Sequence, residues 1–79
     1  MLIGLYCDRE DWALGYLANQ IKNVLGTGEQ LDFIVSSWQR FMETPFSQIS
    51  AFRRCDIIHW LAADGYLHFG KLFPGTAQV

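Results

Sequence analysis

The chain has 79 residues, which is enough for one small domain and too few for two. Hydrophobic residues make up 51% of it and charged residues 18%, so its composition is that of a folded protein and excludes a disordered one. The net charge is −2 and the basic residues are scattered apart from Arg53 and Arg54, which excludes the basic stripe of a nucleic-acid groove.

The first 25 residues predict a strand followed by a helix. Residues 2–7 form a short apolar run that contains a glycine and stops at an acidic cluster, which favours a buried strand. From Glu10 to Leu25 the apolar residues recur at the spacing of an amphipathic helix. Asp8 is placed to be the N-cap of this helix, and Gly26 is placed to end it.

The middle of the chain predicts a second strand and a second helix. Residues 31–36 form an apolar run after the turn residues 26–28, and we expect a strand there. Thr44 and Pro45 have the form of an N-cap and first helical residue. Arg53 and Arg54 then fall in the last turn, where they complement the helix dipole, and we prefer this interpretation to a ligand site.

The last 25 residues predict a third strand, a segment with two open alternatives and the approach to a fourth strand. Residues 55–61, "CDIIHWL", read as the strand. Residues 64–73 predict either one or two helical turns that begin at Asp64 or, because of two glycines, an irregular loop. The ending "TAQV" is typical of the approach to a fourth strand, which we expect to remain incomplete.

Alternating strands and helices predict an α/β fold for residues 1–79, with a small open parallel sheet of three strands and flanking helices in a single Rossmann-like domain. Ligands bind such sheets at the carboxyl ends of the strands. The polar residues expected at that edge are Cys7, Asp8, Ser36, Ser37 and His59.

His59 interrupts an apolar run, and two explanations stay open. It is either a core histidine held by one backbone hydrogen bond or a functional group delivered to the end of a strand. The acidic residues around Asp8 are expected to cap the first helix and to stabilise its dipole. Their position after the first strand also resembles a receiver-domain pocket, but the phosphate-accepting aspartate is missing from the end of the third strand.

Other chemistry finds no support in the sequence. The glycine-rich loop of a dinucleotide or phosphate site is absent, closely spaced Cys and His pairs for a metal are absent, and neither Ser36 nor Ser37 lies in a nucleophile elbow. We therefore expect neither a cofactor nor a metal. Cys7 and Cys55 are expected to be buried free thiols of a cytoplasmic protein, and the chain lacks a run long enough to span a membrane.

The order strand, acidic loop, helix, strand and then "DIIH" resembles the N-terminal domain of retaining nucleotide-sugar glycosyltransferases of the GT-B fold, the glycogen-synthase-like group. Members present a strand of the form Asp-apolar-apolar-His, which Asp56–His59 matches. The ending "PGTAQV" is similar to the start of their next strand, so that this chain would stop one or two residues into it. Here "CDREDW" replaces the glycine-rich loop of many members, and His-Trp-Leu replaces their His-x-His.

The resemblance implies an acceptor-side, N-terminal part of a glycosyltransferase with the strand order 2-1-3. His59 would be its catalytic-site residue, positioning acceptor or sugar, and Cys7, Asp8, Ser36 and Ser37 would bind substrate. We expect the ring of His59 to point toward Cys7 and Asp8. Family members bind the nucleotide sugar mainly through a C-terminal domain, so donor and acceptor would be partners only of a full-length enzyme, and the isolated chain would be inactive.

A second function stays open, that of a non-enzymatic α/β interaction module that binds a protein partner or itself. A third alternative is a small regulator that binds a nucleotide or phosphate. We expect self-association, because a third strand at the edge of an open sheet would leave backbone groups and apolar surface uncovered.

Overall fold

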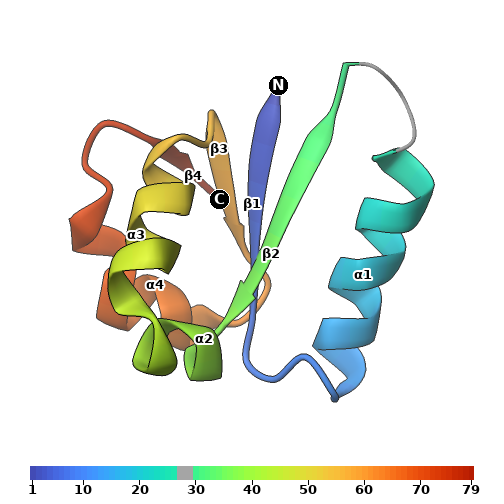
Figure 1. Cartoon of the computed structure of the whole chain (residues 1–79), viewed down its shortest axis with the longest axis horizontal. Helices are drawn as coiled ribbons and strands as arrows, with labels where there is room; N and C mark the ends of the chain where they lie inside the picture. The colour runs from blue at the N-terminus through green and yellow to red at the C-terminus, as the bar shows by residue number, and fades with distance from the viewer. Residues whose placement is uncertain (27–29) are drawn as a thin grey trace.

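The chain forms a parallel sheet with helices on both faces (Figure 1). The computed structural model describes residues 1–26 and 30–79. The sheet has four strands in the order β2-β1-β3-β4, every neighbouring pair being parallel; they are β1 (Leu2–Cys7), β2 (Asp32–Ser37), β3 (Ile57–Trp60) and β4 (Ala77–Gln78). The α/β class and the 2-1-3 order are confirmed, and β4 adds a strand at the edge where β3 was expected.

The helices lie on the two faces in a way that follows from the strand order. They are α1 (Ala13–Leu25), α2 (Trp38–Glu43), α3 (Pro45–Arg53), α4 (Ala63–Phe69) and the short 3-10 turn η1 (Gly70–Leu72). Figure 1 shows α1 on one face and α2, α3 and α4 on the other. The chain passes from β1 to β2 in one direction and then back across β1 to β3, so crossovers of one hand must use opposite faces.

Each face buries its own core. Under α1 the buried residues are Leu5, Ala18 and Phe33. The core under α2, α3 and α4 is larger and mostly aromatic; its buried residues are Tyr6, Phe41, Phe52, Cys55, Ile58, Trp60, Ala62, Phe69 and Phe73. The rings of Phe41 and Phe69 stack with their centroids 4.4 Å apart, which joins α2 to α4. This core takes up six of the twelve aromatic residues, whereas five others are exposed: Trp12, Tyr16, Trp38, Phe46 and Tyr66.

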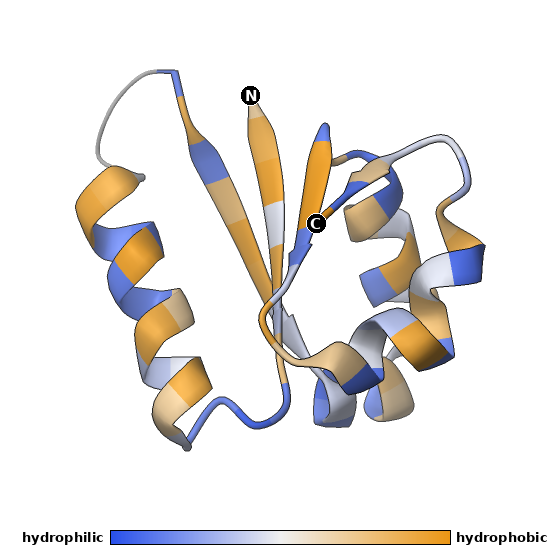
Figure 2. Ribbon diagram, turned by 180° about the vertical axis from the view of Figure 1, so that it is seen from behind, coloured by the Kyte–Doolittle hydropathy of each residue, from blue (hydrophilic) through white to orange (hydrophobic). Residues whose placement is uncertain are grey.

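One part of the sheet is left uncovered. Helix α1 packs against β1 and β2, while the same face of β3 and β4 carries Ile57, His59, Ala77 and Val79, which we call the open face. His59 and Ala77 are exposed, and 70% of Val79 is exposed. In Figure 2 β2 and β1 lie between α1 and these two strands, and the C-terminus lies next to β3. The open face is the least protected part of the described sheet.

The start of α1 differs from the prediction. The helix begins at Ala13 rather than Glu10, its N-cap is Trp12, and acidic residues are absent from its first turn. Asp8 instead accepts a hydrogen bond from the backbone N–H of Arg9, at 2.8 Å. The expected capping and dipole roles of the acidic residues are thus wrong, because the loop turns back on itself before the helix begins. The end of the helix at Leu25, with Gly26 as C-cap, agrees with the prediction.

The second half contains one unexpected helix and small shifts in the others. Strand β2 runs one residue later than predicted, and its last residue, Ser37, is the N-cap of the unexpected helix α2. Helix α3 begins at Pro45 after Thr44 as predicted and ends at Arg53, with Arg54 as its C-cap. The predicted turn residues 27 and 28 lie outside the described residues.

The C-terminal segment is more regular than the sequence indicated. Strand β3 is shorter than predicted, at four residues. Residues 63–72 form α4 and η1, so the irregular-loop alternative is wrong, and α4 begins one residue before Asp64. Residues 77–78 complete a short fourth strand that pairs with Ile57 and Ile58 of β3.

Candidate functional site

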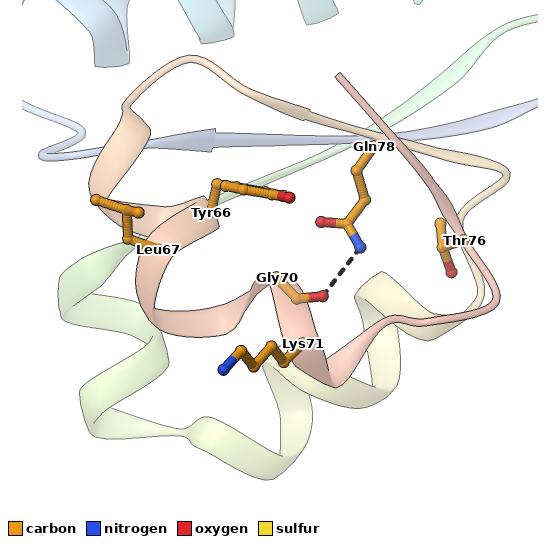
Figure 3. A pocket seen from close by; sticks show the side chains of 6 residues that line it. All are labelled: Tyr66, Leu67, Gly70, Lys71, Thr76 and Gln78. Carbon is orange, nitrogen blue, oxygen red and sulfur yellow. Dashed lines mark hydrogen bonds between the residues drawn. The ribbon is translucent and has the colours of Figure 1, made fainter.

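Two pockets that share lining residues lie along β4, on the flank formed by α4 and η1, and Figure 3 draws the lining of the larger. The larger has a volume of about 430 Å³ and is lined by Tyr66, Leu67, Gly70, Lys71, Thr76 and Gln78. The other, of about 340 Å³, is lined by Trp60, Ala63, Tyr66, Gln78 and Val79. None of the polar residues predicted at the carboxyl edge of the sheet lines either pocket. The predicted site and these two pockets are therefore separate places in the fold.

At the carboxyl edge, the structure brings together three of the predicted site residues. Cys7 ends β1 and pairs in register with Ser37, while Tyr6 pairs with Ser36. The thiol of Cys7 donates to the backbone carbonyl of Ser36, with a sulfur–oxygen distance of 3.4 Å. Cys7, Ser36 and Ser37 are all buried. Proximity at the ends of β1 and β2 was correctly expected from parallel pairing.

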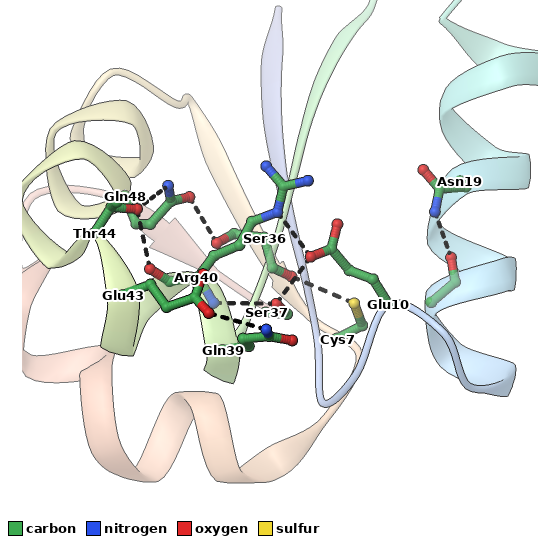
Figure 4. Close-up of polar contacts among 11 residues, drawn as sticks. Cys7, Glu10, Asn19, Ser36, Ser37, Gln39, Arg40, Glu43, Thr44 and Gln48 are labelled. Atoms are coloured by element: carbon green, nitrogen blue, oxygen red, sulfur yellow. Dashed lines mark hydrogen bonds and ion pairs between the residues drawn. The ribbon is translucent and has the colours of Figure 1, made fainter.

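The hydroxyls of both serines are occupied by protein partners (Figure 4). The Ser36 hydroxyl donates to Oε1 of Gln48 in α3, at 2.8 Å. The Ser37 hydroxyl donates to Oε2 of Glu10 at 3.1 Å, and the same carboxylate oxygen accepts from Nε of Arg40 at 2.7 Å. These contacts fasten the loop after β1 to α2, and β2 to α3. Substrate binding by either serine would first have to break them.

Cys7 is also unsuited to nucleophilic chemistry. Burial raises the pKa of its thiol to about 11, and the negative charges of Glu10 and Asp8 act in the same direction. A thiol with such a pKa stays protonated near neutral pH, whereas the thiolate is the reactive form. Cys7 is therefore a buried structural thiol, and so is Cys55, whose pKa burial also raises to about 11.

The acidic loop after β1 is held together by its own residues. The guanidinium of Arg9 binds both carboxylate oxygens of Asp11, at 3.0 and 2.7 Å, and lies over the ring of Trp12, 4.2 Å from its centroid. The hydrogen bonds from Arg9 lower the pKa of Asp11. Among the described residues there is no group of three His, Cys, Asp or Glu side chains arranged to hold a metal ion.

His59 lies one strand away from the serines, on the open face. Its Cα pairs in register with Leu5 of β1, two residues before Cys7. The side chain is exposed, so the alternative of a buried core histidine is wrong. The described interactions contain no hydrogen bond from His59, and a contact of its ring with Cys7 or Asp8 is not among them. Its imidazole is thus available to a ligand, and the predicted direction of the ring stays a prediction.

The reversal of strand order falls between β1 and β3, where open α/β sheets place their ligands. The hydroxyl of buried Tyr6 donates to Oδ2 of Asp64 here, at 3.1 Å, and the N–H of Leu61 donates to the Tyr6 carbonyl at 2.9 Å. Burial, followed by the carboxylate of Asp64, raises the pKa of Tyr6, so the phenol is neutral and donates. The pairing of Tyr6 with Asp64 was missed from the sequence, where Asp64 stood out only as a helix start.

Asp56, the first residue of the Asp-x-x-His motif, lies at the opposite edge of the sheet from His59. Oδ2 of Asp56 accepts a hydrogen bond from the backbone N–H of Leu2, at 2.8 Å. Asp56 therefore ties the amino ends of β1 and β3 together, while His59 lies toward the carboxyl ends. The motif is divided between a structural aspartate and a free histidine.

Comparison with models of protein families, with curated proteins and with solved structures gives no match. The described residues also contain no helix of the length and apolarity needed to cross a bilayer.

Proposed function

We propose that the chain is the acceptor-side, N-terminal part of a glycosyltransferase that uses a nucleotide-sugar donor. The observation that carries this proposal is the position of His59, an exposed imidazole near the carboxyl end of β3 and beside the central strand β1. An imidazole there can donate or accept a hydrogen bond with a sugar hydroxyl and so orient the acceptor or the transferred sugar. Parallel pairing of β4 beside β3 agrees with the strand expected after the Asp-x-x-His segment.

The charged residues of the carboxyl edge support the expectation that this part is inactive alone. A donor diphosphate needs cations, but Arg9 is paired with Asp11 and Arg40 with Glu10. One side of a cleft also supplies neither desolvation nor orientation for transfer. The diphosphate contacts would therefore come from a second domain. A cytoplasmic location belongs to the proposal and is supported by the free thiols of Cys7 and Cys55.

The gene provides the direct test. We expect the reading frame to continue after codon 79 into a second α/β domain, and the complete product to transfer sugar from a nucleotide-sugar donor. The purified chain of 79 residues should transfer none, as measured by release of nucleoside diphosphate from a panel of donors. A stop codon directly after Val79, or robust transfer by the chain alone, would contradict the proposal.

The open face favours a second candidate, an interaction module that associates with itself. Along β4 the backbone groups of Val79 bond to β3, its N–H to Ile58 and its carbonyl to Trp60. Since successive residues of a strand alternate, the backbone groups of Gln78 point to the free edge, next to the open face. A second copy could pair with this edge and cover the apolar side chains.

Sedimentation equilibrium over a wide concentration range tests self-association. We expect a dimer at high concentration that Ala77→Lys, on the open face, weakens at least several-fold. Asn23→Lys, on an exposed position of α1, is the matched control and should leave the equilibrium unchanged. A wild-type chain that stays monomeric at the highest concentration would remove this candidate.

A further inference from the structure

A third pocket lies at the end of the sheet opposite to the carboxyl edge. It has a volume of about 390 Å³ and is lined by Arg53, Leu72, Phe73, Pro74, Gly75 and Thr76. Small-ligand sites usually have volumes of roughly 300 to 1,000 Å³. Arg53 ends α3 shortly before β3 begins, and residues 73–76 lead directly into β4. Since parallel strands begin at the same edge of a sheet, this pocket lies at the amino ends of β3 and β4.

The apolar wall of this pocket is held in place before any ligand arrives. Phe73 is buried in the aromatic core, and Leu72 packs against that core. The backbone N–H of Thr76 donates to the carbonyl of Phe73 at 3.2 Å, which closes the turn that carries Pro74. The side-chain amide of Gln78 donates to the same carbonyl at 2.9 Å. Little ordering of this wall would therefore be needed when a ligand binds.

The charge of the pocket comes from Arg53. Its Nε donates to the backbone carbonyl of Leu72 at 3.4 Å, which places the guanidinium beside the apolar wall. Within the described part of the chain, Arg53 takes part in no ion pair. Among the described residues that line the pocket, Arg53 is the single cation and none is acidic. The pocket thus offers one guanidinium without a counterion next to apolar side chains.

We propose that this pocket binds a small organic carboxylate, with the carboxylate at Arg53 and an apolar body against Leu72 and Pro74. The two oxygens of a carboxylate match the two Nη groups of a guanidinium in a bidentate pair. A carboxylate carries one negative charge, which a single arginine balances, whereas the second charge of a phosphate dianion would stay unbalanced. Contact with the apolar body would remove Leu72 and Pro74 from water. The site lies at the opposite end of the sheet from His59 and does not depend on transferase activity.

The experiment is an NMR titration of the whole ¹⁵N-labelled chain with hexanoate as the probe. Hexanoate should shift the backbone amides of four lining residues, namely Leu72, Phe73, Gly75 and Thr76. Two further compounds, titrated separately, test the two halves of the ligand. Acetate lacks most of the apolar body and hexanamide lacks the charge, so each should bind more weakly than hexanoate.

Substitutions at the end of α3 distinguish Arg53 from the general positive charge there. Arg53→Gln should weaken hexanoate binding by about tenfold, since a charge-assisted hydrogen bond is lost. Arg53→Lys should also bind more weakly than the wild type, because lysine keeps the charge but cannot form the bidentate pair. Arg54→Gln is the matched control and should bind like the wild type, since Arg54 is exposed and is not among the lining residues.

Three results would overturn the proposal. If hexanoate shifts none of the four amides, the pocket is not its site. If Arg53→Gln or Arg53→Lys binds hexanoate as the wild type does, or Arg54→Gln weakens it equally, the guanidinium of Arg53 is not the ligand. If acetate or hexanamide binds as tightly as hexanoate, the pairing of a carboxylate with an apolar body is wrong. Both arginines are exposed, so the variants are expected to fold, and their one-dimensional spectra will verify it.

Discussion

The two histidines of the chain are both exposed but have different neighbours. His59 lies on the open face, where its nearest strand partner is Leu5. The ring of His68, in α4, meets Trp38 edge to face with their centroids 5.0 Å apart and lies 6.2 Å from Phe69. His68 consequently helps to hold α4 against α2, whereas His59 contributes no comparable contact to the described fold.

Replacing each histidine by alanine should therefore affect stability differently. His59→Ala should change the free energy of unfolding by less than about 0.5 kcal/mol. His68→Ala should lower it by about 0.5 to 1.5 kcal/mol, because an aromatic contact is lost. Urea denaturation followed by tryptophan fluorescence measures both. In a complete transferase His59→Ala should also lower kcat strongly, and a variant with normal kcat but lower stability would make His59 structural.

Gly65 is a position where the addition of a single methyl group would cause a steric clash. A Cβ atom there would lie 2.4 Å from two ring carbons of Tyr6 and 2.7 Å from Trp60. Both rings are packed in the aromatic core and cannot move away easily. The backbone of α4 thus approaches β1 and β3 so closely that only glycine fits.

Gly65→Ala should accordingly lower the free energy of unfolding by about 1 to 3 kcal/mol, the usual range for overpacking. Gly75→Ala is the matched control, since a Cβ there would meet nothing within 4 Å, and it should be close to neutral. Thermal melting of both variants, followed by circular dichroism, provides the comparison. Equal melting temperatures would mean that α4 can shift away from the sheet.

At the scale of elements, the side chain of Gln78 adds to the backbone pairing with β3 that holds β4. Two residues make a marginal strand, but the amide of Gln78 connects it to Trp60, Gly70 and Phe73. Gln78→Ala would leave the indole N–H of Trp60 without its partner, whereas the carbonyls of Gly70 and Phe73 would each keep a backbone N–H, from Phe73 and Thr76. Each unsatisfied buried group costs about 1 to 3 kcal/mol, and water entering from the adjoining pocket would offset part of this.

We therefore expect Gln78→Ala to lower the free energy of unfolding by about 2 kcal/mol and to expose the Val79 amide to hydrogen exchange. Gln20→Ala, on the exposed side of α1, should do neither. Amide exchange by NMR distinguishes local release of β4 from general destabilisation. Unchanged protection of Val79 in the Gln78 variant would show that backbone pairing alone holds the strand.

Elements with a clear period or end signal were predictable from the sequence. The apolar spacing between Glu10 and Leu25 placed α1, and Pro45 marked the start of α3. Helix α2 was missed because it begins directly at the end of β2, where Ser37 is both a strand residue and an N-cap. The three residues before Ala13 were assigned to α1 because acidic residues usually begin a helix, but Arg9 binds Asp11 instead.

At the scale of the whole molecule, the thiols of Cys7 and Cys55 and the phenol of Tyr6 make the free energy of unfolding decrease at alkaline pH. Burial raises the pKa of Cys7 and Cys55 from 9.0 to about 11 and also raises that of Tyr6. The folded state then holds these protons more tightly than the unfolded state. Each thiol contributes stability that is fully present below about pH 9 and is lost as the pH rises to about 11.

In the presence of a reducing agent, the urea concentration at the midpoint of unfolding should therefore decrease as the pH is raised from 9 to 11. The loss should be about 1 to 3 kcal/mol for each thiol. Cys55→Ala should show a shallower decline over the same range, because one of the titrating groups has been removed. An identical decline in this variant would show that Cys55 does not contribute.

The site was less predictable than the fold because its contacts join distant parts of the chain. Parallel pairing sufficed to bring Cys7, Ser36 and Ser37 together. The hydrogen bonds that occupy the two serine hydroxyls, however, depend on more distant residues, namely Glu10, Arg40 and Gln48. Asp56 with Leu2 and Asp64 with Tyr6 are separated by 54 and 58 residues. Such pairs leave no local pattern, so the sequence could not assign the two aspartates their structural roles.

The central position of β1 has a consequence for folding on the ribosome. The first strand to be synthesised pairs with β2 and β3, and the second of these begins only at Ile57. Until then β1 is an apolar segment with an unpaired edge, a state prone to aggregation, and contacts between distant segments form slowly. The nascent chain should consequently depend on chaperones until β3 has left the exit tunnel, after which the sheet can close around its oldest strand.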